Sequence, residues 1–181
     1  MRKELQELMA SAGVQLVWLD SKNNISVDRM VSVELRGDCQ FGSGKSGKFK
    51  DHSALASTAV QDGKVLPFSW VDCVALDQFV RPALHDESKA ERSEIYGRAM
   101  ARLLAHEFYH VLAQTEAHTS SGISKTAFSV NDLLADHLTF QTEALTALHI
   151  EAPVVLLSAS FGEEADDISR LEAAEDALAA R

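Results

Sequence analysis

Residues 102–118 read RLLAHEFYHVLAQTEAH and contain the pattern H-E-x-x-H, with a further histidine eight residues later. On an α-helix, residues four positions apart lie on one face, so His106 and His110 can direct two imidazoles at a single metal ion. Glu107 projects beside that face, where it can hold a metal-bound water. The spacing therefore predicts two zinc ligands with a general base next to them.

The residues around the motif predict the helix that carries it. Apolar side chains recur at helical spacing and form a stripe that we expect to face the core. This stripe consists of Leu104, Phe108, Val111 and Leu112. We expect the helix to run from about Ser88 or Arg92 to Ala113, with both histidines off the stripe and facing a cleft.

A catalytic zinc site takes three protein ligands and leaves a position for water. His118 follows the end of the helix, and its loop can return it to the metal. Glu116, six residues after His110, is an alternative. A carboxylate from the next helix is another, and the candidates are Asp132, Asp136 and Glu143. We favour His118, because an imidazole matches a site with two histidines, and we predict that His106, His110 and His118 bind Zn²⁺.

The other chemically interesting residues have simpler interpretations. Four histidines lack partners at ligand spacing, and we interpret them as structural or solvated: His52, His85, His137 and His149. Tyr96 and Tyr109 could assist catalysis, but packing on the helix is the commoner role. Residues 42–48 have the glycine and lysine spacing of a phosphate-binding loop, but Phe49 replaces the hydroxyl residue that would bind magnesium. We therefore interpret residues 37–50 as a polar loop.

The rest of the chain predicts an α+β protein. Residues 2–12 favour a helix that ends at Gly13. Three apolar runs are typical of strands: Val14–Leu19, Val31–Leu35 and Val71–Leu76. Residues 53–60 fit a short helix or a strand, and Asp62-Gly63 predicts a turn. A second long helix is expected from about Asn131, capped there or at Ser129, to His149.

Composition excludes some partners. The chain has 181 residues and a formal net charge of −10, which argues against nucleic acid. It has no apolar run of about 18 residues, so we expect no membrane span. Its first residues are not those of a signal peptide, which predicts a cytoplasmic protein, or a secreted one if the sequence has been trimmed. Cys39 and Cys73 form no C-x-x-C pair, and we interpret them as reduced, partly buried thiols. The sequence indicates no oligomeric state.

Several segments resemble bacterial metzincin-like zinc peptidase domains. The H-E-x-x-H motif, His118 and Gly122-Ile123 resemble the zinc-binding part of these domains. Residues 12–20 and 74–79 resemble the family's first strand and the strand before its zinc helix, and residues 97–105 resemble the start of that helix. The resemblance covers about residues 4–140. It implies a zincin-like fold, in which a small twisted mixed sheet packs on a long zinc-binding helix and a further C-terminal helix follows.

The chain departs from this family at two places. Leu112 and Ala113 fill the region where metzincins have a glycine, and Ser124 stands where they have a methionine beneath the metal. Metal binding does not depend on that methionine, because it is not a ligand. We expect residues 1–150 to form one catalytic domain and residues 151–181, with eight acidic side chains, to form an acidic helical tail.

These residues predict a zinc-dependent metallopeptidase, in which Glu107 is the general base and a peptide or protein is the substrate. An alternative is a catalytically inactive zinc-binding domain that acts as a sensor or interaction module. A third possibility is an interaction domain that binds no metal. Metal content separates the third class from the other two, and hydrolysis separates the first from the second.

Overall fold

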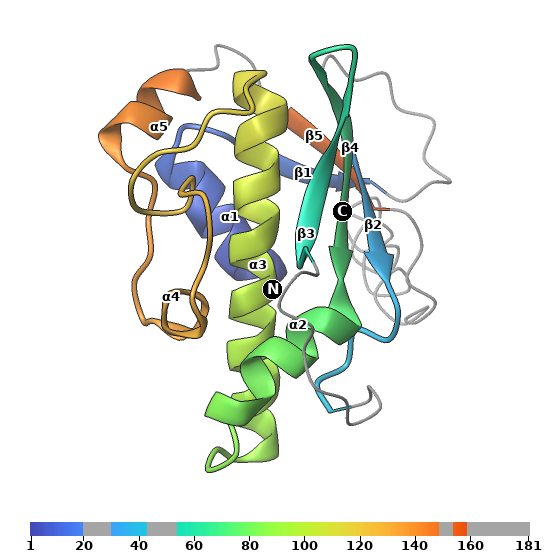
Figure 1. Cartoon of the computed structure of the whole chain (residues 1–181), viewed down its shortest axis with the longest axis vertical. Coiled ribbons are helices and arrows are strands. Elements are labelled where there is room, and N and C mark those ends of the chain that lie inside the picture. Colours follow the sequence, from blue (N-terminus) through green and yellow to red (C-terminus); the bar gives the residue numbers. More distant parts are fainter. Residues whose placement is uncertain (20–29, 43–53, 149–153, 159–181) are drawn as a thin grey trace, which may run out of the picture.

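A computed structural model describes residues 1–19, 30–42, 54–148 and 154–158 of the chain. A mixed sheet and a long helix, α3 (Lys89–Ala113), form its centre (Figure 1). The strands lie in the order β1 (Leu16–Leu19), β5 (Val154–Ser158), β2 (Met30–Arg36), β4 (Lys64–Asp72) and β3 (Ala56–Gln61). Neighbouring strands are parallel except β3, which is antiparallel to β4 and ends the sheet. The prediction of an α+β chain with a mixed sheet is confirmed.

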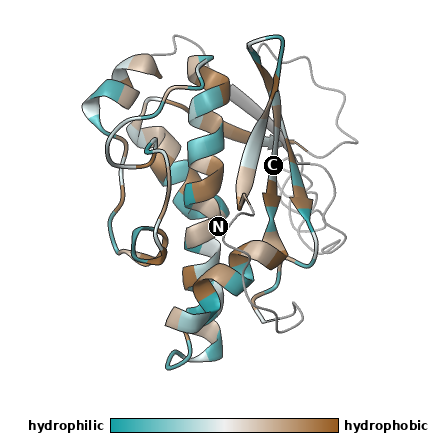
Figure 2. Ribbon diagram, viewed as in Figure 1, coloured by the Kyte–Doolittle hydropathy of each residue, from teal (hydrophilic) through white to brown (hydrophobic). Residues whose placement is uncertain are grey.

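Two helices build the layer beside this sheet. Helix α3 packs against β3 and β4, and α1 (Arg2–Ser11) packs against α3 (Figure 1). Hydrophobic and hydrophilic residues alternate along the ribbon of α3 (Figure 2), yet every residue from 99 to 112 is buried. The predicted apolar stripe therefore lies in the core, as expected, but the histidines and Glu107 of the same turns are buried as well. Among the described residues, no helix is long and apolar enough to cross a membrane.

Local signals located several elements correctly. Gly13, with φ of +77°, follows α1, and β1 and β2 fall within or close to the predicted runs. Ser88 caps α3 and forms a capping box with Glu91. The ambiguous residues 53–60 contain the start of β3, and the turn predicted at Asp62-Gly63 connects β3 to β4. Both turn residues have positive φ, as the twist of a two-residue hairpin requires.

The strand predicted at Val71–Leu76 is wrong, because β4 ends at Asp72 and α2 (Cys73–Val80) begins there. The Asp72 carboxylate accepts a hydrogen bond from the backbone N–H of Ala75 at 2.9 Å and so caps the new helix. A short apolar run is compatible with a buried helix as well as with a strand, and the Asp72 cap favours the helix here. Residues 74–79, which resemble a family strand, therefore belong to a helix. A short 3₁₀ helix, η1 (Arg81–Ala83), follows.

The single helix predicted from about residue 131 to residue 149 is also wrong. Two short helices replace it, α4 (Val130–Leu134), capped by Ser129, and α5 (Thr142–Ala147). The fully buried Arg102 donates hydrogen bonds to the carbonyl oxygens of Asp132 and Leu133 at 2.9 and 3.0 Å. The last carbonyls of a helix lack intrahelical partners, and Arg102 supplies hydrogen bonds to these two at the end of α4.

Part of the predicted acidic tail belongs to the sheet. Strand β5 pairs with β1 on one side and with β2 on the other, although residues 151–181 were expected to be helical. The acidic residues of this segment predict a tail, whereas the apolar run of β5 suits a strand flanked by two parallel neighbours. Residues 159–181 of the expected helical tail lie outside the described residues, as does most of the polar loop.

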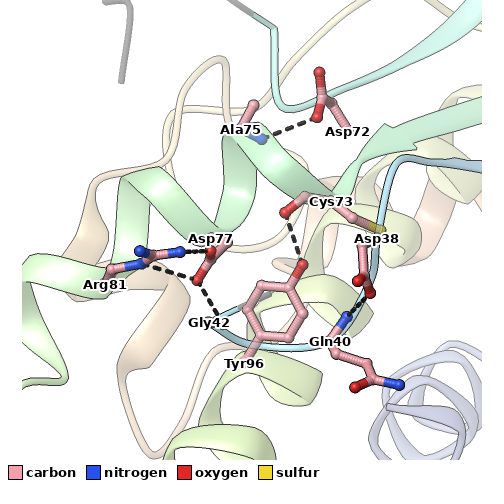
Figure 3. A network of polar contacts seen from close by, with 9 residues as sticks. All are labelled: Asp38, Gln40, Gly42, Asp72, Cys73, Ala75, Asp77, Arg81 and Tyr96. Atoms are coloured by element: carbon pink, nitrogen blue, oxygen red, sulfur yellow. Dashed lines mark hydrogen bonds and ion pairs between the residues drawn. The ribbon is translucent and has the colours of Figure 1, made fainter. Parts of the chain in front are cut away.

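Cys39 and Cys73 form a disulfide, which corrects the expectation of free thiols. The Cα atoms are 4.9 Å apart, because the end of β2 and the start of α2 are neighbours. Figure 3 shows the polar contacts around it: Tyr96 donates to the Cys73 carbonyl at 2.8 Å, and Gly42 donates to the Asp77 carboxylate at 3.2 Å. The segment after β2 is thus attached to α2 at two points.

Replacing Cys39 by serine should lower the free energy of unfolding by about 3 kcal/mol, because the disulfide closes a loop with a sequence separation of 34. For a chain of this size the melting temperature should fall by roughly 6–12 °C. Thermal unfolding of the variant and of the reduced wild type should give similar curves. Two titratable thiols in denatured, unreduced wild type would contradict the disulfide.

Candidate metal centre

His106 and His110 present their Nε2 atoms to the same point. The Nδ1 atom of His106 lies 2.8 Å from the carbonyl oxygen of Ile123, and that of His110 lies 2.7 Å from the carbonyl oxygen of Thr115. A carbonyl oxygen only accepts, so each Nδ1 carries a proton and each neutral ring has its lone pair at Nε2. The two Nε2 atoms are 3.0 Å apart.

The rings are neutral for a physical reason. Burial lowers the pKa of His106 to about 4 and also lowers the pKa of His110, and the nearby histidines add to both effects. Neither Nε2 atom then has a proton to donate to the other. The two rings therefore do not form a hydrogen bond with each other. Their converging lone pairs are instead suited to coordinate a cation.

His118 completes a cluster of three. Its ring stacks on that of His106 at a centroid distance of 5.2 Å and lies 4.8 Å from that of His110. One ligand atom from each histidine lies within 4.8 Å of the others. Nitrogen ligands of a tetrahedral zinc ion lie roughly 3.4 Å apart, so small side-chain rotations would bring all three to one ion. The residues predicted as ligands therefore do lie together and could hold a metal.

The alternative third ligands are placed differently. Glu116 is exposed and lines a cavity that the three histidines also line. Among the described residues, however, the cluster that could hold a metal contains only the histidines. Asp132 completes the capping box of α4 by accepting from the backbone N–H of Ser129, and it also pairs with Lys125. Burial alone would raise the pKa of Asp132, but the hydrogen bonds from Lys125 and Ser129 outweigh this effect and lower the pKa to about 2. Asp136 pairs with Arg98 at 3.3 Å, and Glu143 lies in the first turn of α5.

Glu107 lies beside the histidines and is 5% exposed. It lines the same cavity of about 290 Å³. Burial raises its pKa to about 7, although a hydrogen bond from Thr58 acts in the opposite direction. A divalent cation held by the neighbouring imidazoles would lower this pKa again.

The partners of Glu107 were not visible in the sequence. The hydroxyl of Thr58, on β3, donates to the Glu107 carboxylate at 2.7 Å and lies 2.9 Å from the hydroxyl of Ser69 on β4. Thr58 is 49 residues before Glu107, so no local pattern connects them. The β3–β4 hairpin creates the contact, because it pairs Thr58 with Ser69 beside α3.

The remaining sequence candidates fall outside this centre. Tyr96 is buried and donates to the Cys73 carbonyl, which is the packing role expected for it. Tyr109 is buried near Phe140. His85 is exposed beside Asp86, and His137 is exposed on the segment between α4 and α5. His52 and His149 lie outside the described residues.

No family model matches the chain, and neither a curated protein nor a solved structure matches it. The metzincin-like assignment thus remains a resemblance of sequence segments. The class that the structure defines is coarser: an α+β chain whose long helix and following loop bring three histidines together beside a buried glutamate.

Proposed function

We propose that the protein is a zinc-dependent peptidase. The observation that carries the proposal is the convergence of three imidazoles beside the carboxylate of Glu107 in one open cavity. Three protein ligands leave a zinc coordination position for water, which is the arrangement of catalytic rather than structural sites. Imidazole also binds copper, iron and nickel, but a set of three histidines with an adjacent glutamate favours zinc hydrolysis.

The chain's own residues have clear parts in such a reaction. A zinc ion held by His106, His110 and His118 would supply Lewis acidity and would lower the pKa of a water molecule beside it toward about 7. Glu107 accepts the proton of the attacking water on a carboxylate oxygen and passes it to the leaving amine. Thr58 holds the Oε2 atom of that carboxylate, which leaves Oε1 for the water. The carbonyls of Ile123 and Thr115 hold the Nδ1 protons and so keep the ligand nitrogens available.

The substrate class follows from the strand beside the cavity. Strand β3 ends the sheet, pairs only with β4 among the described residues, and contributes Ala56, Ser57 and Thr58 to the cavity wall. An extended peptide can pair with a free strand edge through its backbone. Such pairing would place a peptide bond next to the histidine cluster, so we propose a peptide or protein substrate. A catalytically inactive zinc-binding sensor remains the second candidate, favoured by the serine at the position of the family's methionine.

Metal analysis and hydrolysis together test the proposal. Protein purified without added zinc should contain about one equivalent of it and should cleave members of a broad peptide library. A chelator should abolish cleavage, and zinc should restore it. A protein that neither contains nor takes up metal contradicts both candidates, and one that binds zinc but cleaves nothing supports the sensor.

Replacing Thr58 by valine should reduce kcat about tenfold while zinc affinity stays unchanged. Valine keeps the shape of threonine but cannot donate to Glu107, so the general base loses the contact that orients it. Thr58→Ser, which keeps the hydroxyl, is the matched control and should retain most of the rate. A loss of zinc in the valine variant would instead show that the hydroxyl supports the metal ligands.

The disulfide bears on location. We propose that the protein works in an oxidising compartment, since disulfides persist there and are rare in the cytosol. This departs from the cytoplasmic expectation and agrees with its secreted alternative. Alkylation of the native protein in freshly broken cells should leave both cysteines unmodified, whereas modification of both would favour the cytoplasm.

A further inference from the structure

One loop, residues 115–125, contacts all three histidines of the cluster. It starts after Gln114, whose left-handed backbone (φ of 50°) ends α3. Its first carbonyl, that of Thr115, accepts from His110, and the carbonyl of Ile123 accepts from His106. His118 lies between them. The loop thus orients two ligands through its backbone and supplies the third itself.

His118 differs from the other two in how it is held. His106 and His110 are buried and each has a carbonyl on Nδ1, whereas His118 is exposed. Among the described residues, no group forms a hydrogen bond with its ring. Apart from the ring contacts with His106 and His110, its position therefore depends on the backbone that carries it. A ligand on a loose backbone binds metal weakly, because the loop has to be ordered first.

The backbone at His118 is fixed by its neighbour, Thr119. The N–H of Thr119 donates to the carbonyl of Ser124 at 2.9 Å. Its hydroxyl donates to the carbonyl of Ser121 at 2.8 Å and lies 2.7 Å from the hydroxyl of Ser124. Since the Thr119 proton points to Ser121, Ser124 donates to Thr119 in this pair.

The Ser124 side of this pair is anchored in the protein. Ser124 is fully buried, and the N–H of its neighbour Ile123 donates to the carbonyl of Thr139 at 3.0 Å. Gly122 allows this approach, because a Cβ there would lie 2.5 Å from the Thr139 oxygen. Thr119 thus connects His118 to Ser124, which lies in the buried and anchored part of the loop.

We propose that the Thr119–Ser124 hydroxyl pair positions His118 for metal binding. The inference rests on the proposed function only in taking His118 as a ligand. It assigns Ser124, which replaces the family's methionine, a polar role in place of an apolar one. Thr119 and Ser124 are positioning residues, since neither would touch the metal.

Two substitutions at Thr119 separate the hydroxyl from the rest of the side chain. Thr119→Val keeps the shape and removes the hydroxyl, and Thr119→Ser keeps the hydroxyl. Removing a group that orients a metal ligand typically weakens metal binding by about 10–100-fold, so the zinc Kd of the valine variant should rise by that factor. The zinc Kd of the serine variant should stay close to that of wild type. The visible spectrum of bound cobalt should change in the valine variant but not in the serine variant. Ser124→Ala should repeat the valine result and covers the case in which Thr119→Val folds poorly.

A double-mutant cycle tests whether the pair acts through His118. In a His118→Ala background, measured at higher zinc concentrations, Thr119→Val should have no further effect on Kd. An equal loss in both backgrounds would overturn the proposal, and so would wild-type affinity and cobalt spectra in both hydroxyl-removing variants. These outcomes differ from failure of the proposed function, which appears as wild-type protein that binds no metal at all.

Discussion

Replacing His118 by alanine should raise the zinc Kd by more than about 100-fold, because a missing ligand should cost more than a missing orienting partner. His106 and His110 would remain with their Nδ1 protons held by carbonyls, so the two-histidine site would persist in weakened form. Competition with a chromophoric chelator measures the affinity. Without metal, the variant and the wild type should unfold at nearly the same temperature, since His118 is exposed.

Glu116→Ala is the matched control for this variant. Glu116 lies two residues away on the same loop, is also exposed and lines the same cavity. Its removal should leave the affinity nearly intact, apart from a small effect of losing a negative charge near His110. The reverse pattern, with Glu116→Ala severe and His118→Ala mild, would transfer the third ligand position to Glu116.

The histidine cluster could be predicted from the sequence because its members are close together along the chain. His106 and His110 are one helical turn apart, and His118 follows on the adjoining loop, so spacing alone was informative. The partner of Glu107 is not local. Thr58 reaches Glu107 only because the sheet places β3 beside α3, and such a contact depends on pairing that no short pattern encodes.

The errors in the fold have the same origin. The run that contains α2 is apolar in either conformation, and an aspartate cap together with burial on α3 made it helical. Strand β5 pairs with β1 and β2, which are far from it in sequence. Its place in the sheet therefore depends on tertiary contacts rather than on local sequence. Cys39 and Cys73 pair for that reason too: the parallel pairing of β2 with β4 brings together segments that are distant in sequence.

Replacing Glu107 by glutamine should lower kcat by about 10²–10⁴-fold and leave zinc affinity close to wild type. Glutamine has almost the same shape, and its amide oxygen can still accept the hydrogen bond from Thr58. It cannot accept a proton from water, so the variant loses the base but keeps the geometry. Activity and bound metal, measured on the same preparation, test both parts.

The same variant distinguishes a peptidase from a contaminating activity and from a sensor. Cleavage at the wild-type rate by Glu107→Gln would place the general base elsewhere or attribute the cleavage to another protein. Loss of both zinc and cleavage would mean that the Glu107 carboxylate helps to hold the metal. The structure gives that carboxylate a different partner, the hydroxyl of Thr58 on β3. Only loss of cleavage with zinc retained assigns Glu107 the proton transfer, because the three imidazoles and their carbonyl partners are the same in both proteins.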